Sequence, residues 1–326
     1  MTKLDPLVRQ VLSLVASAAV AASVGSTPAL AQDGAQATTE AAPEMRTRLL
    51  TSLTGYEVSE YLKRNDVIFV PVGPTEVNGG SPTDVEYVIP LAFAMKLAEK
   101  GDGLVLPYLA YFYPGATTTS PATVYMSTSD TLPFLKALTR SLIRQGFRRI
   151  VFLSSHGPSG NTLLPLVRET FDEHHVPVLW MDTGQIRKVN PGEPRGAAFG
   201  EGPPNARRLV TFGAYEIADR LNDIPIGLTQ PREVFARDPS NLSRYVPPAQ
   251  GTPAGSFYAD PSEHGGWVDP ITAAQRTEWG RDGAAYIESQ VAAFDVHGML
   301  NALRQRDEFT KELEEKYGDL LPAFGR

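Results

Sequence analysis

Val67-Ile68-Phe69-Val70-Pro71-Val72 is a run of apolar residues followed by a loop of turn-forming residues, Gly73 to Thr83. Successive residues of a strand face opposite sides of a sheet, so a strand that is apolar at every position is buried on both faces. This is typical of a strand inside a parallel sheet that helices cover on both sides. A second run of this kind, Arg149-Ile150-Val151-Phe152-Leu153-Ser154-Ser155, lies further along the chain.

Helical patterns separate the apolar runs. From Leu49 onward we predict helices over residues 52–64, 85–100, 131–145 and 163–174, and two further strands over 104–107 and 176–181. The clearest helix is 131–145, where Asp130 can cap the first turn and Gly146 stands where a helix ends. Repeated β–α units with connections of this length predict an α/β fold of three layers with a mostly parallel central sheet.

Composition excludes several functional classes. The 326 residues include 37 acidic and 30 basic residues, a formal net charge of -7, and no cysteine. A chain without a basic stripe is not expected to bind nucleic acid. The absence of cysteine excludes disulfide scaffolds, thiolate metal sites and thiol nucleophiles. Any metal ion must therefore be held by histidine, aspartate and glutamate.

The N-terminus has the pattern of a bacterial secretory signal peptide. Lys3 and Arg9 precede an alanine- and serine-rich apolar run, Val11 to Val24, and Ala29-Leu30-Ala31 forms a cleavage signature before Gln32. A transmembrane anchor is the alternative, but the run is short for a membrane span. We expect a periplasmic or secreted protein with no stable membrane insertion after cleavage.

Three regions follow from these patterns. Residues 1–31 are the expected signal peptide, and residues 32–48 form a flexible lead-in that is rich in Ala, Thr and Gln. Residues 49–326 form the α/β domain. In such domains, chemistry gathers beyond the carboxyl ends of the strands, which is where the polar loops after Val72 and Leu153 lie.

The first of these loops resembles a family signature. It reads Val70-Pro71-Val72-Gly73-Pro74-Thr75-Glu76-Val77-Asn78-Gly79, with Pro82-Thr83-Asp84 after it. This resembles the creatininase (creatinine amidohydrolase) family, in which a strand leads into P-x-G-[ST]-x-E-x-H-G and a later Asp.

The second loop extends the resemblance. Ser141-Leu142-Ile143-Arg144-Gln145-Gly146-Phe147-Arg148-Arg149-Ile150-Val151 precedes Ser155-His156-Gly157 and Gly160-Asn161. This is similar to the family's R-S-L-x-x-x-G-F-x-R-I-V followed by N-G-H-G-G-N. Asp260-Pro261 is a weaker match to the family's G-D-P motif.

The resemblance implies a creatininase-like fold and a metal-dependent amidohydrolase that cleaves the C–N bond of a small, often cyclic amide. Together with the signal-peptide pattern, this predicts an exported enzyme. The resemblance also implies a homo-oligomer. A bound divalent ion, with zinc first and manganese or iron as alternatives, would activate a water molecule. The residues carried over as metal ligands are Glu76, Asp84 and His156. Beside them we expect Glu216 and His264 as catalytic residues, and Asn78, Ser155 and Asn161 as substrate-binding residues.

The departures from the family pattern leave alternatives open. Asn78 stands where the family has a histidine, and Thr211 where another would be, so one ion fits the sequence better than two. His264, in a glycine-containing loop, could supply the missing imidazole, and Glu201 competes with Glu216 for the later glutamate. Asp84 also suits the N-cap of the helix that begins at Val85. The second hypothesis is therefore a non-catalytic creatininase-fold protein whose degraded metal site serves binding or assembly.

Overall fold

A parallel sheet forms the centre of the computed structural model, which describes residues 45–188, 204–228, 257, 264 and 270–318. All of these belong to one unit of the chain, Glu44–Arg326. In the described residues the sheet has the strand order β2-β1-β3-β4, and every pairing is parallel. The strands are β1 (Val67–Pro71), β2 (Leu104–Val105), β3 (Arg149–Ser154) and β4 (Leu179–Asp182). The predicted parallel sheet is confirmed.

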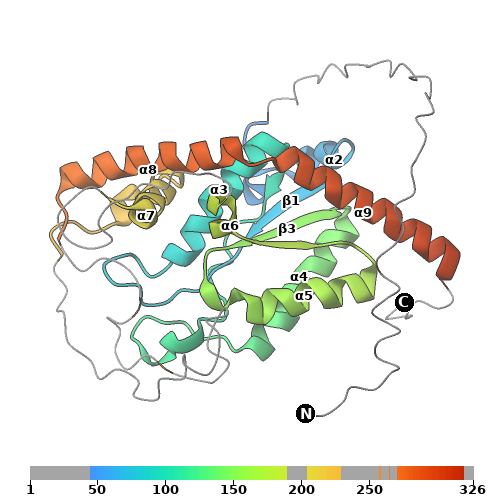
Figure 1. The fold of residues 1–326 in the computed structure, drawn as a ribbon, viewed down its shortest axis with the longest axis horizontal. Coiled ribbons are helices and arrows are strands. Elements are labelled where there is room, and N and C mark those ends of the chain that lie inside the picture. The colour runs from blue at the N-terminus through green and yellow to red at the C-terminus, as the bar shows by residue number, and fades with distance from the viewer. Residues whose placement is uncertain (1–44, 189–203, 229–256, 258–263, 265–269, 319–326) are drawn as a thin grey trace, which may run out of the picture. The chain divides into compact units, whose positions relative to one another are not determined.

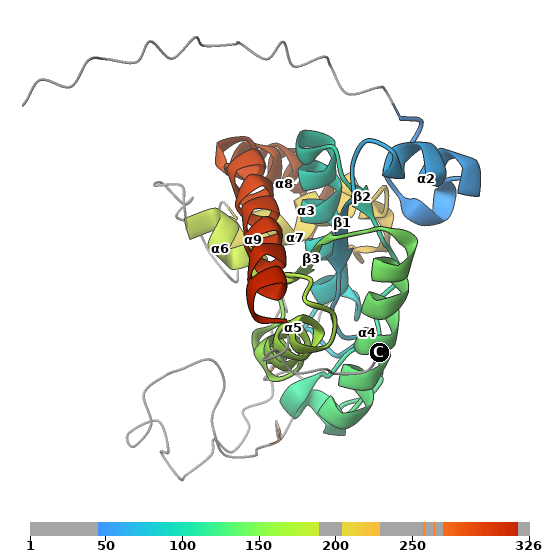
Figure 2. The same ribbon diagram turned by 90° about the vertical axis from the view of Figure 1, so that its right-hand side faces the viewer.

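Helices cover both faces of this sheet. Alternate residues of β1 enter different clusters: Val67 and Phe69 pack with helices α3, α7, α8 and α9, whereas Ile68 and Val70 pack with α2, α4 and α5. Figure 2 shows α8 and α9 on one side of β1, and α2 and α4 on the other. Figure 1 shows the order of the helices, which are α2 (Gly55–Leu62), α3 (Val85–Gly101), α4 (Thr128–Gln145), α5 (Gly160–His174), α6 (Thr183–Lys188), α7 (Ala206–Ile217), α8 (Ala273–Ala293) and α9 (Val296–Tyr317).

The ends of the helices follow local capping chemistry. Gly146 ends α4 with a φ of 109°, in the left-handed region, as expected. The start of α4 was predicted wrongly, because Ser127 and not Asp130 is the N-cap: the Ser127 hydroxyl accepts a hydrogen bond from the Asp130 backbone N–H at 3.1 Å. In α2, Thr54 and Glu57 form a capping box, so the helix begins at Gly55 and not at Ser52.

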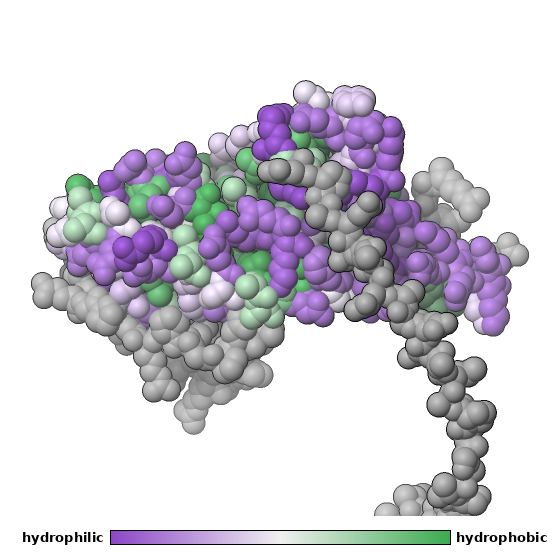
Figure 3. All heavy atoms as spheres, turned by 90° about the horizontal axis from the view of Figure 1, so that it is seen from above, coloured by the Kyte–Doolittle hydropathy of each residue, from purple (hydrophilic) through white to green (hydrophobic). Residues whose placement is uncertain are grey.

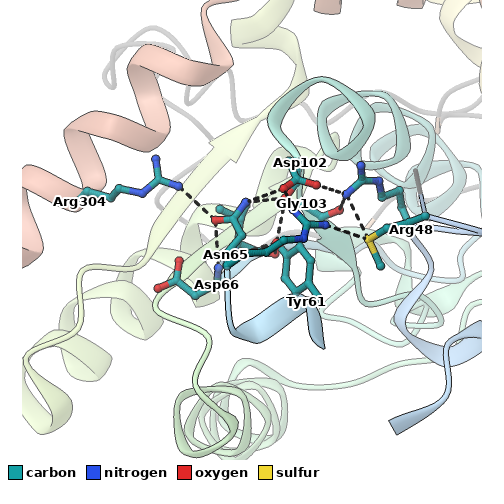
Figure 4. Close-up of polar contacts among 10 residues, drawn as sticks. Arg48, Tyr61, Asn65, Asp66, Asp102, Gly103 and Arg304 are labelled. Carbon is teal, nitrogen blue, oxygen red and sulfur yellow. Dashed lines mark hydrogen bonds and ion pairs between the residues drawn. The ribbon is translucent and has the colours of Figure 1, made fainter. Parts of the chain in front are cut away.

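Asp102, the left-handed residue that ends α3, gathers polar groups from several segments (Figure 4). Its carboxylate accepts hydrogen bonds from Arg48 and Arg64, and its carbonyl accepts from Tyr61 Oη at 2.9 Å and Asn65 Nδ2 at 2.6 Å. The Arg48 contact joins the last residues of the expected lead-in to the end of α3.

Polar residues predominate on the face of the molecule seen in Figure 3, where apolar side chains form small separate groups. Within the described residues, no helix combines the length and apolar character that a membrane span requires. The apolar residues instead lie mainly in the two clusters beside the sheet.

The central strands β1 and β3 are parallel neighbours, with Val67 opposite Arg149 and Pro71 opposite Leu153. Their carboxyl ends therefore lie at the same edge of the sheet. The loop that carries Glu76 follows β1, and His156 follows β3. The topology thus brings these two residues to one place although they are distant in the sequence.

Candidate metal centre

The loop after β1 passes very close to the first turn of α3. A Cβ atom on Gly73 would lie 2.5 Å from the carbonyl carbon of Glu86 and 2.7 Å from the backbone nitrogen of Tyr87. Real Cβ atoms do not come this close to backbone, so only glycine permits this approach. The Glu76 backbone N–H then bonds to Thr83 O at 2.8 Å, which closes the loop. This packing sets Glu76 beside Glu86.

Two carboxylates and two imidazoles meet at this edge of the sheet. One ligand atom each of Glu76, Glu86 and His264 lie within 4.8 Å of one another. His264 Nε2 is 3.8 Å from Glu76 Oε1, and the His264 ring is held by a hydrogen bond between Nδ1 and Val77 O at 2.7 Å. His156 Nδ1 contacts Glu86 Oε2 and lies 3.3 Å from Glu76 Oε1. The cluster thus contains two types of group that bind divalent ions, carboxylate and imidazole.

The electrostatics of the cluster favour a proton on His156. Burial acts to lower the pKa of His156, but the charge of Glu86 and the hydrogen bonds to both carboxylates raise it to about 10. Burial acts to raise the pKa of Glu86, yet the charge and hydrogen bonds of His156 lower it to about 2. Burial raises the pKa of Glu76, which is fully buried. When both carboxylates are ionised, an imidazolium between them leaves one net negative charge for a cation.

Two buried atoms of this cluster have no hydrogen-bond partner among the described residues. They are Oε1 of Glu76 and Nε2 of His156. A buried polar atom without a partner costs about 1–3 kcal/mol, so such atoms in a folded protein call for an explanation. Together with the carboxylate of Glu86 and the imidazole of His264, the Glu76 oxygen offers donors that suit zinc, manganese or iron. The residues present therefore fit a divalent metal ion.

Asp84, one of the predicted ligands, is engaged elsewhere. Its Oδ1 accepts a hydrogen bond from Tyr215 Oη at 2.8 Å, and its Oδ2 accepts one from Arg220 Nη1 at 2.6 Å. Asp84 precedes α3 as its N-cap residue, but its side chain makes no capping hydrogen bond. Both Asp84 oxygens thus have hydrogen-bond donors, and a guanidinium neutralises the charge of Asp84. Asp84 does not belong to the group of possible metal ligands formed by Glu76, Glu86 and His264.

The other predicted residues are distributed around the sheet edge. Asn78 is buried near Glu76, and the Ser155 hydroxyl donates to the carbonyl of Glu86 at 3.1 Å, so both lie close to the cluster. Asn161 is exposed in the first turn of α5. Glu216 is exposed on α7, with its carboxylate beside Gly280 of α8. Glu201 lies outside the residues that the structure describes.

Two residues of the site were missed from the sequence. Glu86 belongs to the first turn of α3, where a carboxylate is also favoured by the helix dipole, so its sequence context suggested no chemistry. Its position two residues after Asp84 was the one available signal. Thr117 donates a hydrogen bond to Glu76 Oε2 from a loop 41 positions away, and no motif points to it.

Comparisons with known proteins agree with the resemblance seen in the sequence. The family model described as Creatininase: Creatinine amidohydrolase matches residues 51–204. A putative creatinine amidohydrolase from Bacteroides fragilis is 16% identical, with a TM-score of 0.50, over 81% of this chain and 98% of that one. A structure described as creatininase Mn is 18% identical, with a TM-score of 0.47, over 80% and 98%. No curated protein matches the chain.

Proposed function

Because the chain belongs to the creatininase family over residues 51–204, we propose that it is a metal-dependent amidohydrolase. Its reaction is hydrolysis of the C–N bond of a small amide, such as a lactam or a cyclic imide. The observation that carries this proposal is Oε1 of Glu76, which has no hydrogen-bond partner among the described residues and is buried among Glu86, His156 and His264. A fully buried carboxylate oxygen facing two imidazoles is an arrangement that a divalent cation would stabilise.

Glu76, Glu86 and His264 are the residues that would hold the ion. When bound, a divalent ion polarises the amide carbonyl and lowers the pKa of a water molecule toward neutrality. The hydrogen bond between His264 Nδ1 and Val77 O orients the ring, so that Nε2 faces Glu76. Such a bond to the second ring nitrogen fixes the orientation of ligating histidines.

His156 is the proton carrier in this proposal. Its Nδ1 is held between two carboxylates, and in its protonated form it also carries a proton on Nε2, the buried nitrogen without a partner among the described residues. We assign that proton to the leaving nitrogen of the amide, whose departure as a neutral amine requires protonation. After the transfer, the neutral imidazole keeps its Nδ1–H between Glu76 and Glu86.

Glu76→Gln tests the proposal, because it preserves shape and removes the charge that a cation needs. We expect the metal content of the purified protein and hydrolysis of a panel of lactams and cyclic imides to fall together by about tenfold or more. Glu99→Gln is the matched control, since Glu99 is an exposed glutamate of α3 that pairs with Lys96 at 3.3 Å. Unchanged metal content in folded Glu76→Gln would overturn the proposal.

A non-catalytic protein of the same fold is the second candidate function. The engagement of Asp84 by Tyr215 and Arg220 favours it, because this removes one of the expected carboxylate ligands. Metal binding by the wild type without hydrolysis of any amide in the panel would support this candidate. Hydrolysis that depends on Glu76 would exclude it.

Export and assembly are further parts of the proposal. The signal pattern that ends at Ala31 supports export to the periplasm or the medium, with a mature chain that begins at Gln32. These residues lie outside the described part of the chain. An intact-mass measurement on exported protein tests the cleavage, and light scattering at micromolar concentration tests the expected homo-oligomer.

A further inference from the structure

Thr117 reaches the carboxylate of Glu76 from a separate loop. It lies in a 3-10 helix, Gly115–Thr119, and its side chain is almost fully buried, with 1% of the residue exposed. Its hydroxyl contacts Glu76 Oε2, and Pro114 O lies at 3.2 Å from the same hydroxyl. A hydroxyl has one proton to donate and can bond to only one of these acceptors at a time. The charged carboxylate is the stronger acceptor.

Hydrogen bonds from backbone groups and threonine hydroxyls hold the Thr117 loop against the Glu76 loop on both sides. The Thr75 hydroxyl donates to Ala110 O at 2.8 Å, and Val124 N–H donates to Thr75 O at 2.9 Å. Val77 N–H also donates to the Thr123 hydroxyl at 3.3 Å. The contact between Thr117 and Glu76 therefore joins two segments that other hydrogen bonds already hold together, so its geometry does not depend on one flexible side chain alone.

The contact decides which carboxylate oxygen faces the cluster. With Oε2 held by Thr117, the other oxygen, Oε1, lies 3.3 Å from His156 Nδ1 and 3.8 Å from His264 Nε2. Oε1 is the oxygen that lacks a hydrogen-bond partner in the described part of the chain. A carboxylate that loses its anchor can rotate about its terminal bond, where the torsional preference is broad.

We propose that Thr117 is a positioning residue that anchors Glu76 Oε2 and thereby presents Oε1 to the metal ion. This inference rests on the proposed function, since it concerns the same site. Removal of a residue that orients a metal ligand typically lowers metal affinity about 10–100-fold. Thr117 itself does not touch the ion or the substrate in this role.

The test is zinc titration by calorimetry of the full mature protein after chelator treatment. Thr117→Val keeps the shape and removes the hydroxyl, and we expect it to weaken zinc binding about 10–100-fold. Thr117→Ser restores the hydroxyl and should bind zinc within about threefold of the wild type. Thr118→Val is the matched control: its hydroxyl donates to a backbone carbonyl, Gly115 O at 3.1 Å, in the same short helix. It should bind zinc like the wild type.

The outcomes separate the inference from the proposed function. Wild-type protein that binds no zinc would overturn the proposed function and the inference with it. Zinc binding by the wild type and equally by Thr117→Val would overturn the inference alone. Equal weakening in Thr117→Ser and Thr117→Val would assign the effect to lost packing of the methyl group, and would also overturn it.

Two further measurements guard against misfolding. Both metal-free variants should give cooperative melting curves, with Thr117→Val melting at the lower temperature because it alone removes a hydrogen bond to a buried carboxylate. If Thr117→Val does not fold, Thr117→Ala takes its place. In the Glu76→Gln background, Thr117→Val should change zinc affinity by less than about threefold, because the anchored carboxylate is gone. A full additive loss there would contradict the anchoring role.

Discussion

Substitution of Gly73 by alanine tests the close packing that assembles the site. The added Cβ would lie 2.5 Å from the carbonyl carbon of Glu86, whereas real Cβ atoms keep at least 3.0 Å. The loop and the first turn of α3 must therefore separate by more than 0.5 Å (3.0 − 2.5 Å), because the carbonyl oxygen of Glu86 lies closer still to the added Cβ. Since the atoms that collide belong to a helix backbone, we expect the upper half of the usual cost of overpacking, about 2–3 kcal/mol.

The same displacement should weaken metal binding. Metal–ligand distances tolerate only about 0.2 Å, and Gly73 controls how the Glu76 loop meets Glu86. We expect a lower free energy of unfolding in urea and a loss of zinc affinity of about tenfold or more. Gly55→Ala is the control, because no atom lies within 4 Å of its added Cβ. If Gly73→Ala and Gly55→Ala have the same free energy of unfolding and the same zinc affinity, the packing argument is refuted.

Two further predictions concern stability. Lys100 Nζ donates to three carbonyls at the end of α8, those of Val291, Ala292 and Phe294, at 3.1, 2.6 and 2.8 Å. Lys100→Met should therefore lower the free energy of unfolding in urea by about 1–2 kcal/mol. A loss no larger than that of the control Lys63→Met, at an exposed lysine, would contradict this prediction. Burial acts to raise the pKa of Asp307, but its hydrogen bonds with Arg148 and Lys311 hold the pKa of Asp307 below its ordinary value, so its contribution to stability is complete above about pH 4 and is lost as the pH falls through the folded-state value. Asp307→Asn should therefore lower the free energy of unfolding at pH 7 by about 1.5–3 kcal/mol. The difference from the wild type should shrink as the pH falls through the folded-state pKa of Asp307, and a constant difference down to acid pH would contradict the prediction.

Local patterns in the sequence predicted most of the secondary structure. The apolar runs around Phe69 and Val151 became the central strands β1 and β3, because a strand apolar at every position has to be buried on both faces. Errors occurred at helix starts, where the choice of cap depends on geometry: Ser127 is the N-cap of α4, where Asp130 was expected. The family resemblance was also present in the sequence alone, since its motifs follow the strands directly.

The sequence by itself determined the class of fold, the edge of the sheet where polar loops gather, and the presence there of Glu76 and His156. Only the tertiary structure decided which side chains share the site. Glu86 joins it because Gly73 lets the loop touch α3, and Asp84 is drawn instead to Arg220, 136 positions away. The physical reason is range: capping and hydrophobic periodicity act between near neighbours in the chain, whereas a carboxylate takes whichever cation the packed fold brings within hydrogen-bond distance.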